Sequence, residues 1–346
     1  MLDWTTTETH LLLNPRMPAA DRAALQQLVR DVPPLEAHVW LATSGTTGAL
    51  KLTALSKRAL LASAAAVNRH LQSNEHDVWL NVLPPFHVGG LGIHARAYLS
   101  GARVEAQPWD AELFVASHAT LSALVPAQVS DLVRGGLRAP KAMRAIVVGG
   151  GALSPELYRD AQALGWPVRP SYGMTECCSQ IATARGTSPE LLLLDHVDAR
   201  TTDDGRLAFR SESLLTGYAT FERGFFDPKV DGWFVSEDLG EVEGRVLRVR
   251  GRAGEFLKIG GESVDLQRLD RILAEIAGAD AALVPVEDER LGHVLQLALA
   301  GGDAEAIVAA FNARVMPYER IRSVQRVPEI PRTALGKLQR AKLRGQ

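Results

Sequence analysis

The sequence predicts an α/β protein. It has a large N-terminal domain with mostly parallel sheets and a small β subdomain, followed by a small α+β C-terminal domain. From Trp40 to about Gly165, short apolar runs alternate with helical stretches, which is typical of a largely parallel sheet. Glycine-rich stretches follow some of these runs, as they do where ligands bind beyond the carboxyl ends of strands. From Arg206 to Arg250, short strands separated by glycine turns indicate the β subdomain.

Length and composition agree with two domains. They give no indication of a nucleic-acid-binding, membrane-spanning, secreted or zinc-binding protein. The chain has 346 residues, of which 46% are hydrophobic and 23% charged, enough for a large core. A net charge of -2 gives no general reason to expect binding to nucleic acid or to an anionic membrane. No apolar run approaches the ~20 residues of a membrane span, and residues 1–13 do not resemble a secretory signal. Cys177 and Cys178 are adjacent and match no zinc-ligand spacing, so we expect a reducing cytoplasm.

In the first domain, the elements follow from apolar runs and punctuating residues. Residues 1–36 are weakly patterned, with a helix over 20–29 that Pro33 and Pro34 end. Ser154 as N-cap and Pro155 at the first helical position predict a helix to about Leu164. Apolar runs predict strands over 38–41, 78–83, 102–106, 121–125 and 145–148. The stretches between them predict helices over 59–70, 91–99, 111–117 and 128–133.

The second half of the chain is predicted to hold the β subdomain and a separate α+β unit. Strands over 207–210, 233–235 and 245–250 should be antiparallel, and residues 251–254 should form a linker. Beyond it we expect helices over 266–276 and 304–314 and strands over 282–286, 294–300 and 323–327. We therefore divide the chain into an N-terminal domain, 1–252, and a C-terminal domain, 253–346.

The stretch from Thr43 to Lys51 has a composition that suits an anion. Its first six positions hold four hydroxyl residues and two glycines. Glycines let the backbone approach a phosphate closely, and successive N–H groups and hydroxyls donate to it. Lys51 adds a point charge. The stretch is not a Walker A loop, because no Gly-Lys-Ser/Thr triplet closes it. A polar turn between a strand and a helix is the alternative.

Four motifs occur in order along the chain: Thr43–Lys51, Tyr172–Glu176, Asp238 with Arg252, and Gly336-Lys337. With these motifs the chain resembles the adenylate-forming enzymes, which include acyl-CoA synthetases, non-ribosomal adenylation domains and luciferases. Within that superfamily, the segments 85–91, 149–151 and 171–181 are most similar to the o-succinylbenzoate–CoA ligases of menaquinone biosynthesis. The resemblance covers roughly Trp40 to the C-terminus. It implies activation of an aryl carboxylate, best o-succinylbenzoate, with ATP and Mg²⁺, and then thioester formation with CoA.

The resemblance implies a role for each matched residue of the nucleotide site. Glu176 would hold Mg²⁺, a hard cation that prefers oxygen ligands, and Thr175 would donate to the α-phosphate. The phosphates of ATP would be held by Thr43, Ser44, Gly45, Thr46, Thr47, Gly48 and Lys51. Adenine and ribose would be held by Tyr172, Gly150, Gly151, Asp238 and Arg252. The alternatives are a buried core aromatic for Tyr172, a solvated loop acid for Glu176 or Asp238, and a surface arginine for Arg252.

The resemblance also implies a catalytic lysine and a hinge. Lys337 would bridge the attacking carboxylate and the α-phosphate, where stabilising developing charge is worth a factor of roughly 10²–10³. The alternative is that Lys337 is one cation of a basic tail. Gly254 stands at the hinge position of the family. A rotation there would exchange Lys337 for Gly260, Gly261 and Glu262, which would meet the pantetheine thiol of CoA.

A third set of residues is expected to line the acyl pocket. It consists of His87, Val88, Gly89, Gly90, Gly149, Cys178 and Ser179. The glycines suit a flat aryl acid. His87 is also a catalytic candidate, either at the entrance for CoA or against the substrate carboxylate, although a lone histidine after a strand is equally well structural. The cysteines have no adjacent base that would make one a nucleophile.

Three departures from the family pattern keep other functions open. Only about forty residues precede the phosphate loop, Leu50 and Leu52 replace the proline and glycine common around Lys51, and Glu237 stands where glycine is usual. One alternative is an adenylating ligase that charges a carrier protein or another nucleophile. Another is a non-catalytic module that binds a nucleotide or an acyl group. The sequence leaves the oligomeric state open, with a homodimer among the alternatives.

Overall fold

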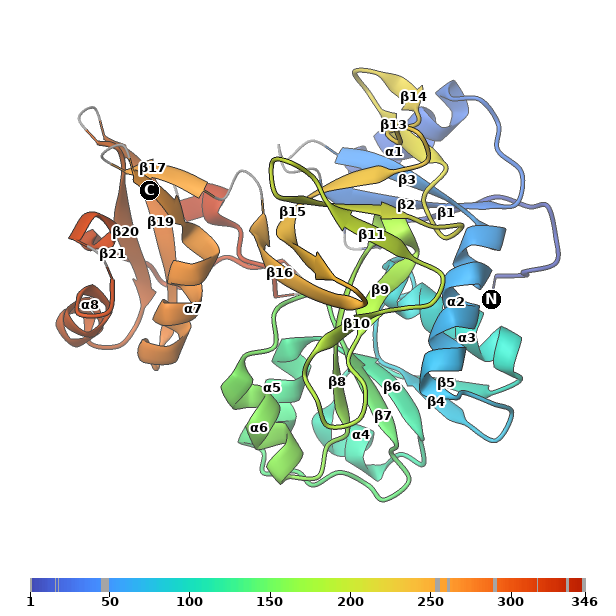
Figure 1. Cartoon of the computed structure of the whole chain (residues 1–346), viewed down its shortest axis with the longest axis horizontal. Helices are drawn as coiled ribbons and strands as arrows, with labels where there is room; N and C mark the ends of the chain where they lie inside the picture. The colour runs from blue at the N-terminus through green and yellow to red at the C-terminus, as the bar shows by residue number, and fades with distance from the viewer. Residues whose placement is uncertain are drawn as a thin grey trace. The chain divides into compact units, whose positions relative to one another are not determined.

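A computed structural model describes residues 2–15, 17, 19–44, 50–252, 256–259, 262–288, 291–315, 317–333 and 336–343 (Figure 1). The chain forms two compact units. Unit 1 comprises residues 1–201, 208–236 and 242–248, and unit 2 comprises 202–207, 237–241 and 249–346. The domain boundary between residues 252 and 253 stays a prediction. Among the described residues, no helix has the length and apolar character needed to cross a membrane.

The first sheet of unit 1 carries the ends of the phosphate loop. Its order is β1-β2-β3-β13-β14. Helix α1 packs on it through Leu25 and Leu28. The bounds are β1 His10–Leu12, α1 Ala19–Asp31, β2 His38–Ser44, β3 Leu50–Ser56, β13 Gly217–Thr220 and β14 Gly224–Phe226.

Strand β3, between the phosphate loop and the predicted helix, was not predicted. It runs antiparallel to β2, with Thr43 opposite Lys51. The cause is Leu52 to Leu55, whose four side chains are all buried. Helix α2, Lys57–Leu71, begins only after this strand, where the Ser56 Oγ accepts from the Ala59 N–H at 3.0 Å.

The second sheet has eleven strands in the order β11-β12-β15-β16-β10-β9-β8-β7-β6-β4-β5. Its parallel part consists of β4 Val78–Asn81, β5 Arg103–Ala106, β6 Leu121–Leu124, β7 Ala145–Val148 and β8 Val168–Met174. This confirms the predicted parallel strands for this part of the chain, whereas the sheet as a whole is mixed, because β9, β10 and β16 pair antiparallel beyond β8. The strand Val168–Met174 was not predicted, because its Arg, Pro, Ser and Gly residues show no apolar run.

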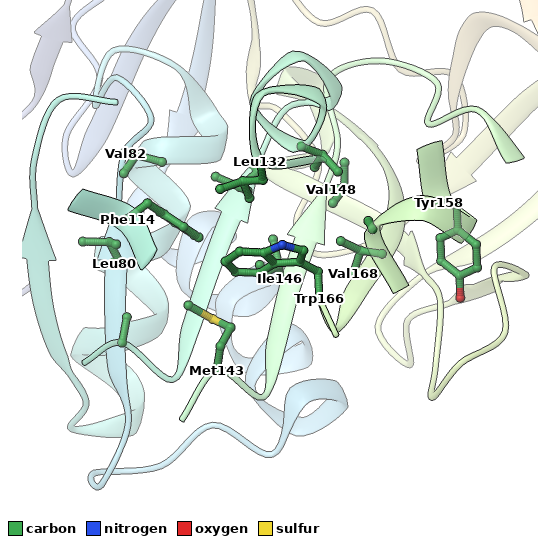
Figure 2. Packing of buried hydrophobic residues seen from close by; sticks show 14 residues of the cluster. Leu80, Val82, Phe114, Leu132, Met143, Ile146, Val148, Tyr158, Trp166 and Val168 are labelled. Carbon is green, nitrogen blue, oxygen red and sulfur yellow. The ribbon is translucent and has the colours of Figure 1, made fainter. Parts of the chain in front are cut away.

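Helices cover both faces of the parallel strands. On one face, Trp166 and Phe114 pack with Ile146 and Leu132 in a cluster under α4, α5 and α6 (Figure 2). On the other face, α2 and α3 pack against Trp79, Leu121 and Val147. The bounds are α3 Val88–Ser100, α4 Ala111–Ala116, α5 Pro126–Arg134 and α6 Pro155–Ala163. The Ser154 Oγ caps α6 by accepting from the Leu157 N–H at 3.1 Å, as predicted.

The remaining strands extend the second sheet beyond β8. They are β9 Ser179–Thr183, β10 Leu191–Leu193, β11 Asp198–Thr201, β12 Arg206–Arg210, β15 Phe234–Glu243 and β16 Val246–Arg252. Strands β8 and β9 form an antiparallel hairpin around the short 3₁₀ helix η1, Thr175–Cys177. The predicted linker at 251–254 is wrong for its first two residues, since β16 continues through Gly251 and Arg252. The apolar alternation ends at Val249, which is why the sequence suggested an earlier end.

The third sheet, in unit 2, confirms the predicted small α+β unit. Its order is β18-β17-β20-β19, with β21 parallel to β20. Leu269 and Leu273 of α7 pack with Ile307 and Phe311 of α8 in its core. The bounds are β17 Phe256–Ile259, β18 Glu262–Asp265, α7 Leu266–Ile276, β19 Asp280–Asp288, β20 Gly292–Ala300, α8 Ala304–Asn312, η2 Pro317–Glu319, β21 Ile321–Arg326 and η3 Arg340–Leu343.

A buried lysine at the start of α2 holds residues 3–6 in place. The Lys57 side chain is 2% exposed. Its Nζ donates to the Asp3 carbonyl at 2.6 Å, the Thr6 carbonyl at 2.9 Å and the Thr6 hydroxyl at 3.0 Å. Three acceptors satisfy an ammonium group that burial would otherwise destabilise.

Candidate active site

The predicted adenine residues meet at the carboxyl ends of β7 and β8. The glycine triplet 149–151 directly follows β7. A Cβ on Gly149 would lie 3.7 Å from the Ser171 carbonyl oxygen, and one on Gly150 would lie 3.4 Å from a Val125 methyl. Gly150 also has φ +77°, which favours glycine. The triplet therefore passes close to the segment that leads into Tyr172.

Tyr172 begins a hairpin turn whose backbone is tightly constrained. Its half-buried ring lies 6.0 Å from the buried Phe209 ring, tilted by 42°. At the next residue, a Cβ on Gly173 would lie 1.8 Å from the Ser179 carbonyl oxygen, so only glycine fits. Across the turn, Cys178 and Ser179 have φ +55° and +104°. Such conformations are costly for residues other than glycine and often occur at functional sites.

Lys51 and Glu176 meet although 125 residues separate them in sequence. The Lys51 Nζ lies 3.4 Å from the Glu176 Oε1. The Tyr218 hydroxyl donates to the same oxygen at 2.7 Å, and the Lys51 Nζ lies 3.8 Å from the centroid of the Tyr218 ring. The Leu215 N–H donates to the Glu176 carbonyl at 2.7 Å, which fixes the turn. The structure thus brings the phosphate-loop lysine into contact with the predicted metal ligand, and the Tyr218 side chain contacts both.

Tyr218 is a site residue that sequence reasoning missed. It lies on β13 opposite Thr53 of β3, so its position depends on a long-range strand pairing. The Thr53 hydroxyl, in turn, lies 3.4 Å from that of the predicted phosphate ligand Thr43. A tyrosine in an apolar strand gives no signal of this role in the sequence.

The Glu176 carboxylate fits a magnesium ion. Both of its hydrogen bonds go to Oε1, and Oε2 has no partner within the described part of the chain. The described residues contain no group of three or more His, Cys, Asp or Glu side chains that would hold a metal on their own. Mg²⁺ is commonly bound by one or two carboxylates together with substrate phosphates. One free carboxylate oxygen beside a phosphate-loop lysine matches that chemistry.

The predicted acyl-pocket residues lie along the start of α3 and beside β9. His87 is the N-cap residue, and burial lowers the pKa of its ring, which keeps it neutral at pH 7. A Cβ on Gly90 would lie 2.4 Å from the Pro84 carbonyl oxygen, so the helix packs closely on the loop after β4. Two residues on, Gly92 lies against Ser179, at 3.7 Å between their Cβ positions. Cys178 is buried, and burial raises the pKa of its thiol, consistent with a lining residue.

Arg96 is the second site residue that the sequence did not indicate. It lies on α3, one turn beyond Gly92, and is 2% exposed. Its Nη2 donates to the Ser179 Oγ at 3.3 Å, and its guanidinium carbon lies 5.4 Å from the Trp79 ring centroid. Its Nε and Nη1 are buried without a hydrogen-bond partner among the described residues. Burial lowers the pKa of Arg96 to about 10. A buried cation without a carboxylate partner is destabilising unless a ligand pairs with it.

Lys337 lies in unit 2 in a hydrogen-bonded turn. Its N–H donates to the Thr333 Oγ1 at 3.1 Å, and its carbonyl accepts from the Thr333 N–H at 2.8 Å. It lines a pocket of about 490 Å³ with two ion pairs, Arg332 with Asp280 and Arg340 with Asp270. Lys337 itself is exposed and makes no ion pair within the residues that the structure describes. It is therefore unlike its neighbour Arg340, whose charge is neutralised.

The remaining predicted residues are only partly described. Asp238 lies half-buried on β15, and the unusual Glu237 before it forms an ion pair with Arg206 at 3.5 Å. Only the backbone is described for Ser44, Arg252 and Glu262. Gly45, Thr46, Thr47, Gly48, Gly254, Gly260 and Gly261 lie outside the described residues.

Comparison with known proteins identifies the fold and the family. Residues 7–208 match the family model described as AMP-binding enzyme. The chain belongs to the AMP-binding enzyme family. The matched region of this family member contains the Thr43–Lys51 and Tyr172–Glu176 motifs, whereas Asp238 and Lys337 lie beyond it.

The individual relatives and solved structures to which this AMP-binding enzyme is similar carry names of the same activity. The chain is 30% identical over 331 residues to the 2-succinylbenzoate–CoA ligase of Staphylococcus epidermidis, with 88% of this chain and 69% of that one covered. It superposes with a TM-score of 0.81 and 25% identity on the o-succinylbenzoate CoA synthetase (MenE) from Bacillus subtilis in complex with the acyl-adenylate intermediate OSB-AMP, covering 89% and 69% of the two chains. The same enzyme in complex with ATP and magnesium ion gives a TM-score of 0.78 at 25% identity, covering 88% and 69%.

Proposed function

We propose that this AMP-binding enzyme is an o-succinylbenzoate–CoA ligase. In the first step, a carboxylate oxygen of the acid attacks the α-phosphorus of ATP, the bond to the β-phosphate breaks, and pyrophosphate leaves. In the second, the thiol of CoA loses its proton and attacks the acyl carbon, the bond to AMP breaks, and the thioester forms. The proposal is supported by the names of the relatives and by the complexes of the similar structures. We place the reaction in the cytoplasm; a homodimer stays a prediction that sedimentation would test.

The contact between Lys51 and Glu176 carries the proposal. It brings an ammonium group and a carboxylate to one place, 3.4 Å apart, at the end of the phosphate loop. Lys51 would pair with the phosphates of ATP, and Glu176 would hold Mg²⁺ through its free oxygen. The metal, when bound, neutralises phosphate charge. Tyr218 orients the Glu176 carboxylate, because its hydroxyl donates to Oε1 at 2.7 Å.

Arg96 supports a substrate with two carboxylates. One carboxylate of o-succinylbenzoate is activated, and the other stays charged throughout the reaction. Two buried nitrogens of Arg96 have no partner among the described residues, and a guanidinium fork matches a carboxylate in geometry and charge. We therefore assign recognition of the second carboxylate to Arg96, with Ser179 holding the guanidinium in place at 3.3 Å.

The other roles remain those predicted from the sequence. Tyr172 with Gly150 and Gly151 would hold adenine, and Asp238 would hold the ribose. Thr175 would donate to the α-phosphate. His87, neutral because of its burial, would lie at the acyl pocket without adding charge. Lys337 would act in the adenylation step only, and its lack of an ion pair in the described residues leaves its charge available.

Pyrophosphate exchange into ATP tests the proposal. We expect exchange that requires Mg²⁺ and o-succinylbenzoate, and a CoA thioester when CoA is added. If benzoate or a fatty acid supports exchange while o-succinylbenzoate does not, the substrate is wrong and the enzyme class stands. Exchange without a thioester would favour a carrier-protein acceptor. Nucleotide binding without exchange for any acid would favour a non-catalytic module.

A further inference from the structure

A second pocket lies at the edge of the parallel strands opposite to the candidate active site. Ala145 is the first residue of β7, Arg169 is the second of β8, and Ala184 follows the last residue of β9. The pocket has a volume of about 200 Å³, and its lining is completed by His70, Leu71, Gln72, Arg144, Arg185 and Gly186. None of the residues assigned to ATP, Mg²⁺, CoA or the acid belongs to this lining.

The lining is strongly positive. Arg169 is half-buried and Arg185 exposed, and neither side chain makes a hydrogen bond or an ion pair within the described parts of the chain. The His70 Nε2–H donates to the Ala184 carbonyl at 3.1 Å. Burial, and then the charges of Arg185, Arg169 and Arg245, lower the pKa of His70. Every charge that acts appreciably on this histidine is therefore positive.

Asp77, the carboxylate in contact with the lining residue Arg144, is already neutralised. Arg144 pairs with both carboxylate oxygens of Asp77. The same guanidinium donates to the Leu71 carbonyl at 2.5 Å and to the Gln72 carbonyl at 3.0 Å. These carbonyls end α2, where the helix dipole would otherwise repel an anion. With the charge of Arg144 neutralised by Asp77, Arg169 and Arg185 remain as the arginines of the lining that can pair with a ligand.

We propose that this pocket binds a small phosphate-type oxyanion, such as inorganic phosphate or pyrophosphate. Guanidinium groups form forked hydrogen bonds with phosphate oxygens. The volume is below the ~300–1,000 Å³ of pockets that take drug-sized ligands, which excludes ATP and CoA as whole ligands. The site is separate from the ligase reaction, so it goes beyond the proposed function and does not depend on it.

Isothermal titration of the full chain with pyrophosphate, and separately with phosphate, at constant ionic strength tests the proposal. A Lys51→Ala background weakens anion binding at the phosphate loop. In that background, binding should persist, and Arg169→Gln or Arg185→Gln should weaken it by about 10- to 100-fold, as expected for a lost charge-assisted hydrogen bond. Arg103→Gln, at an exposed arginine of β5, is the matched control and should leave the affinity unchanged.

Two outcomes would overturn the proposal. One is the absence of anion binding in the Lys51→Ala protein at millimolar concentrations. The other is binding there that neither the Arg169 nor the Arg185 substitution changes. Circular dichroism checks the fold of each variant, and since Arg185 is exposed, its variant keeps the test valid even if Arg169→Gln unfolds. A ligase that is inactive toward every acid would not affect either outcome.

Discussion

Replacing Arg96 with methionine should stabilise the protein and impair its choice of substrate. The cause is burial, which lowers the pKa of Arg96 from its ordinary value to about 10. At 1.36 kcal/mol per pKa unit, that shift corresponds to about 3 kcal/mol of unfavourable free energy at neutral pH. Methionine fills a similar volume without the charge. It loses the contact with Trp79, worth about 0.5–2 kcal/mol, and the hydrogen bond to Ser179.

With about 1 kcal/mol for the lost hydrogen bond, the expected net stabilisation of the Arg96→Met variant is about 0–1.5 kcal/mol. For a unit of this size, each kcal/mol raises Tm by about 2–4 °C. Thermal unfolding followed by circular dichroism, without ligands, measures this part of the prediction. Arg96→Lys, which keeps a buried charge, is the matched control and should not be more stable than the wild type.

The catalytic part of the prediction compares two acids. Truncating one partner of a buried charge pair costs about 2–5 kcal/mol, so kcat/KM for o-succinylbenzoate should fall by about 30-fold to several thousand-fold. The analogue 4-oxo-4-phenylbutyrate lacks the ring carboxylate, and its kcat/KM should change by only a few-fold. The ratio of the two values, from pyrophosphate exchange, is the measurement. A variant that keeps the wild-type ratio, or that loses both activities equally, would refute the role of Arg96.

Three further predictions address other parts of the molecule. Lys337→Ala should slow adenylation by roughly 10²–10³ and leave thioester formation from a supplied acyl-adenylate nearly unchanged; equal losses in both half-reactions would contradict its role. Tyr218→Phe removes the donor to Glu176 and should raise the Mg²⁺ concentration for half-maximal exchange several-fold, whereas an unchanged value would exclude an orienting role. Burial alone would raise the pKa of Asp77, but hydrogen bonds, chiefly from Arg144, lower it to about 2. Because that pKa lies below its unfolded value, Asp77 contributes about 2 kcal/mol above about pH 4, lost as the pH falls toward 2. Urea unfolding of Asp77→Asn should lack this acid dependence, and a slope like that of the wild type would contradict the assignment.

The sequence predicted the parts of the fold that depend on local pattern. Strand β7 is a run of four buried apolar residues between turn residues, and α6 begins with Ser154 and Pro155, so both were predictable. Strand β8 was missed because its Arg, Pro, Ser and Gly residues carry no periodic apolar signal. Its extended backbone is set by pairing with two strands. Strand β7 is separated from it by helix α6, and β9 was itself not predicted from the sequence.

The difference between local sequence pattern and long-range packing also explains which site residues were predicted. Lys51 and Glu176 lie in motifs whose composition indicates chemistry. Tyr218 acquires its role only through the pairing of β13 with β3, and Arg96 only through the burial of its side chain on α3. A helix with one arginine ordinarily exposes it to solvent, so the sequence gives no reason to expect a buried cation there. The burial of the Arg96 charge away from any carboxylate among the described residues can be seen only in the structure.

The anchoring of the N-terminal segment by Lys57 has a consequence for proteolysis. Removing residues 2–8 would leave this ammonium group at the start of α2 with none of its three acceptors. A cleavage that releases residues 2–8 would therefore destabilise the phosphate-loop hairpin that leads into α2, although it touches no residue of the reaction. A protease acting at this segment would shorten the lifetime of the active enzyme.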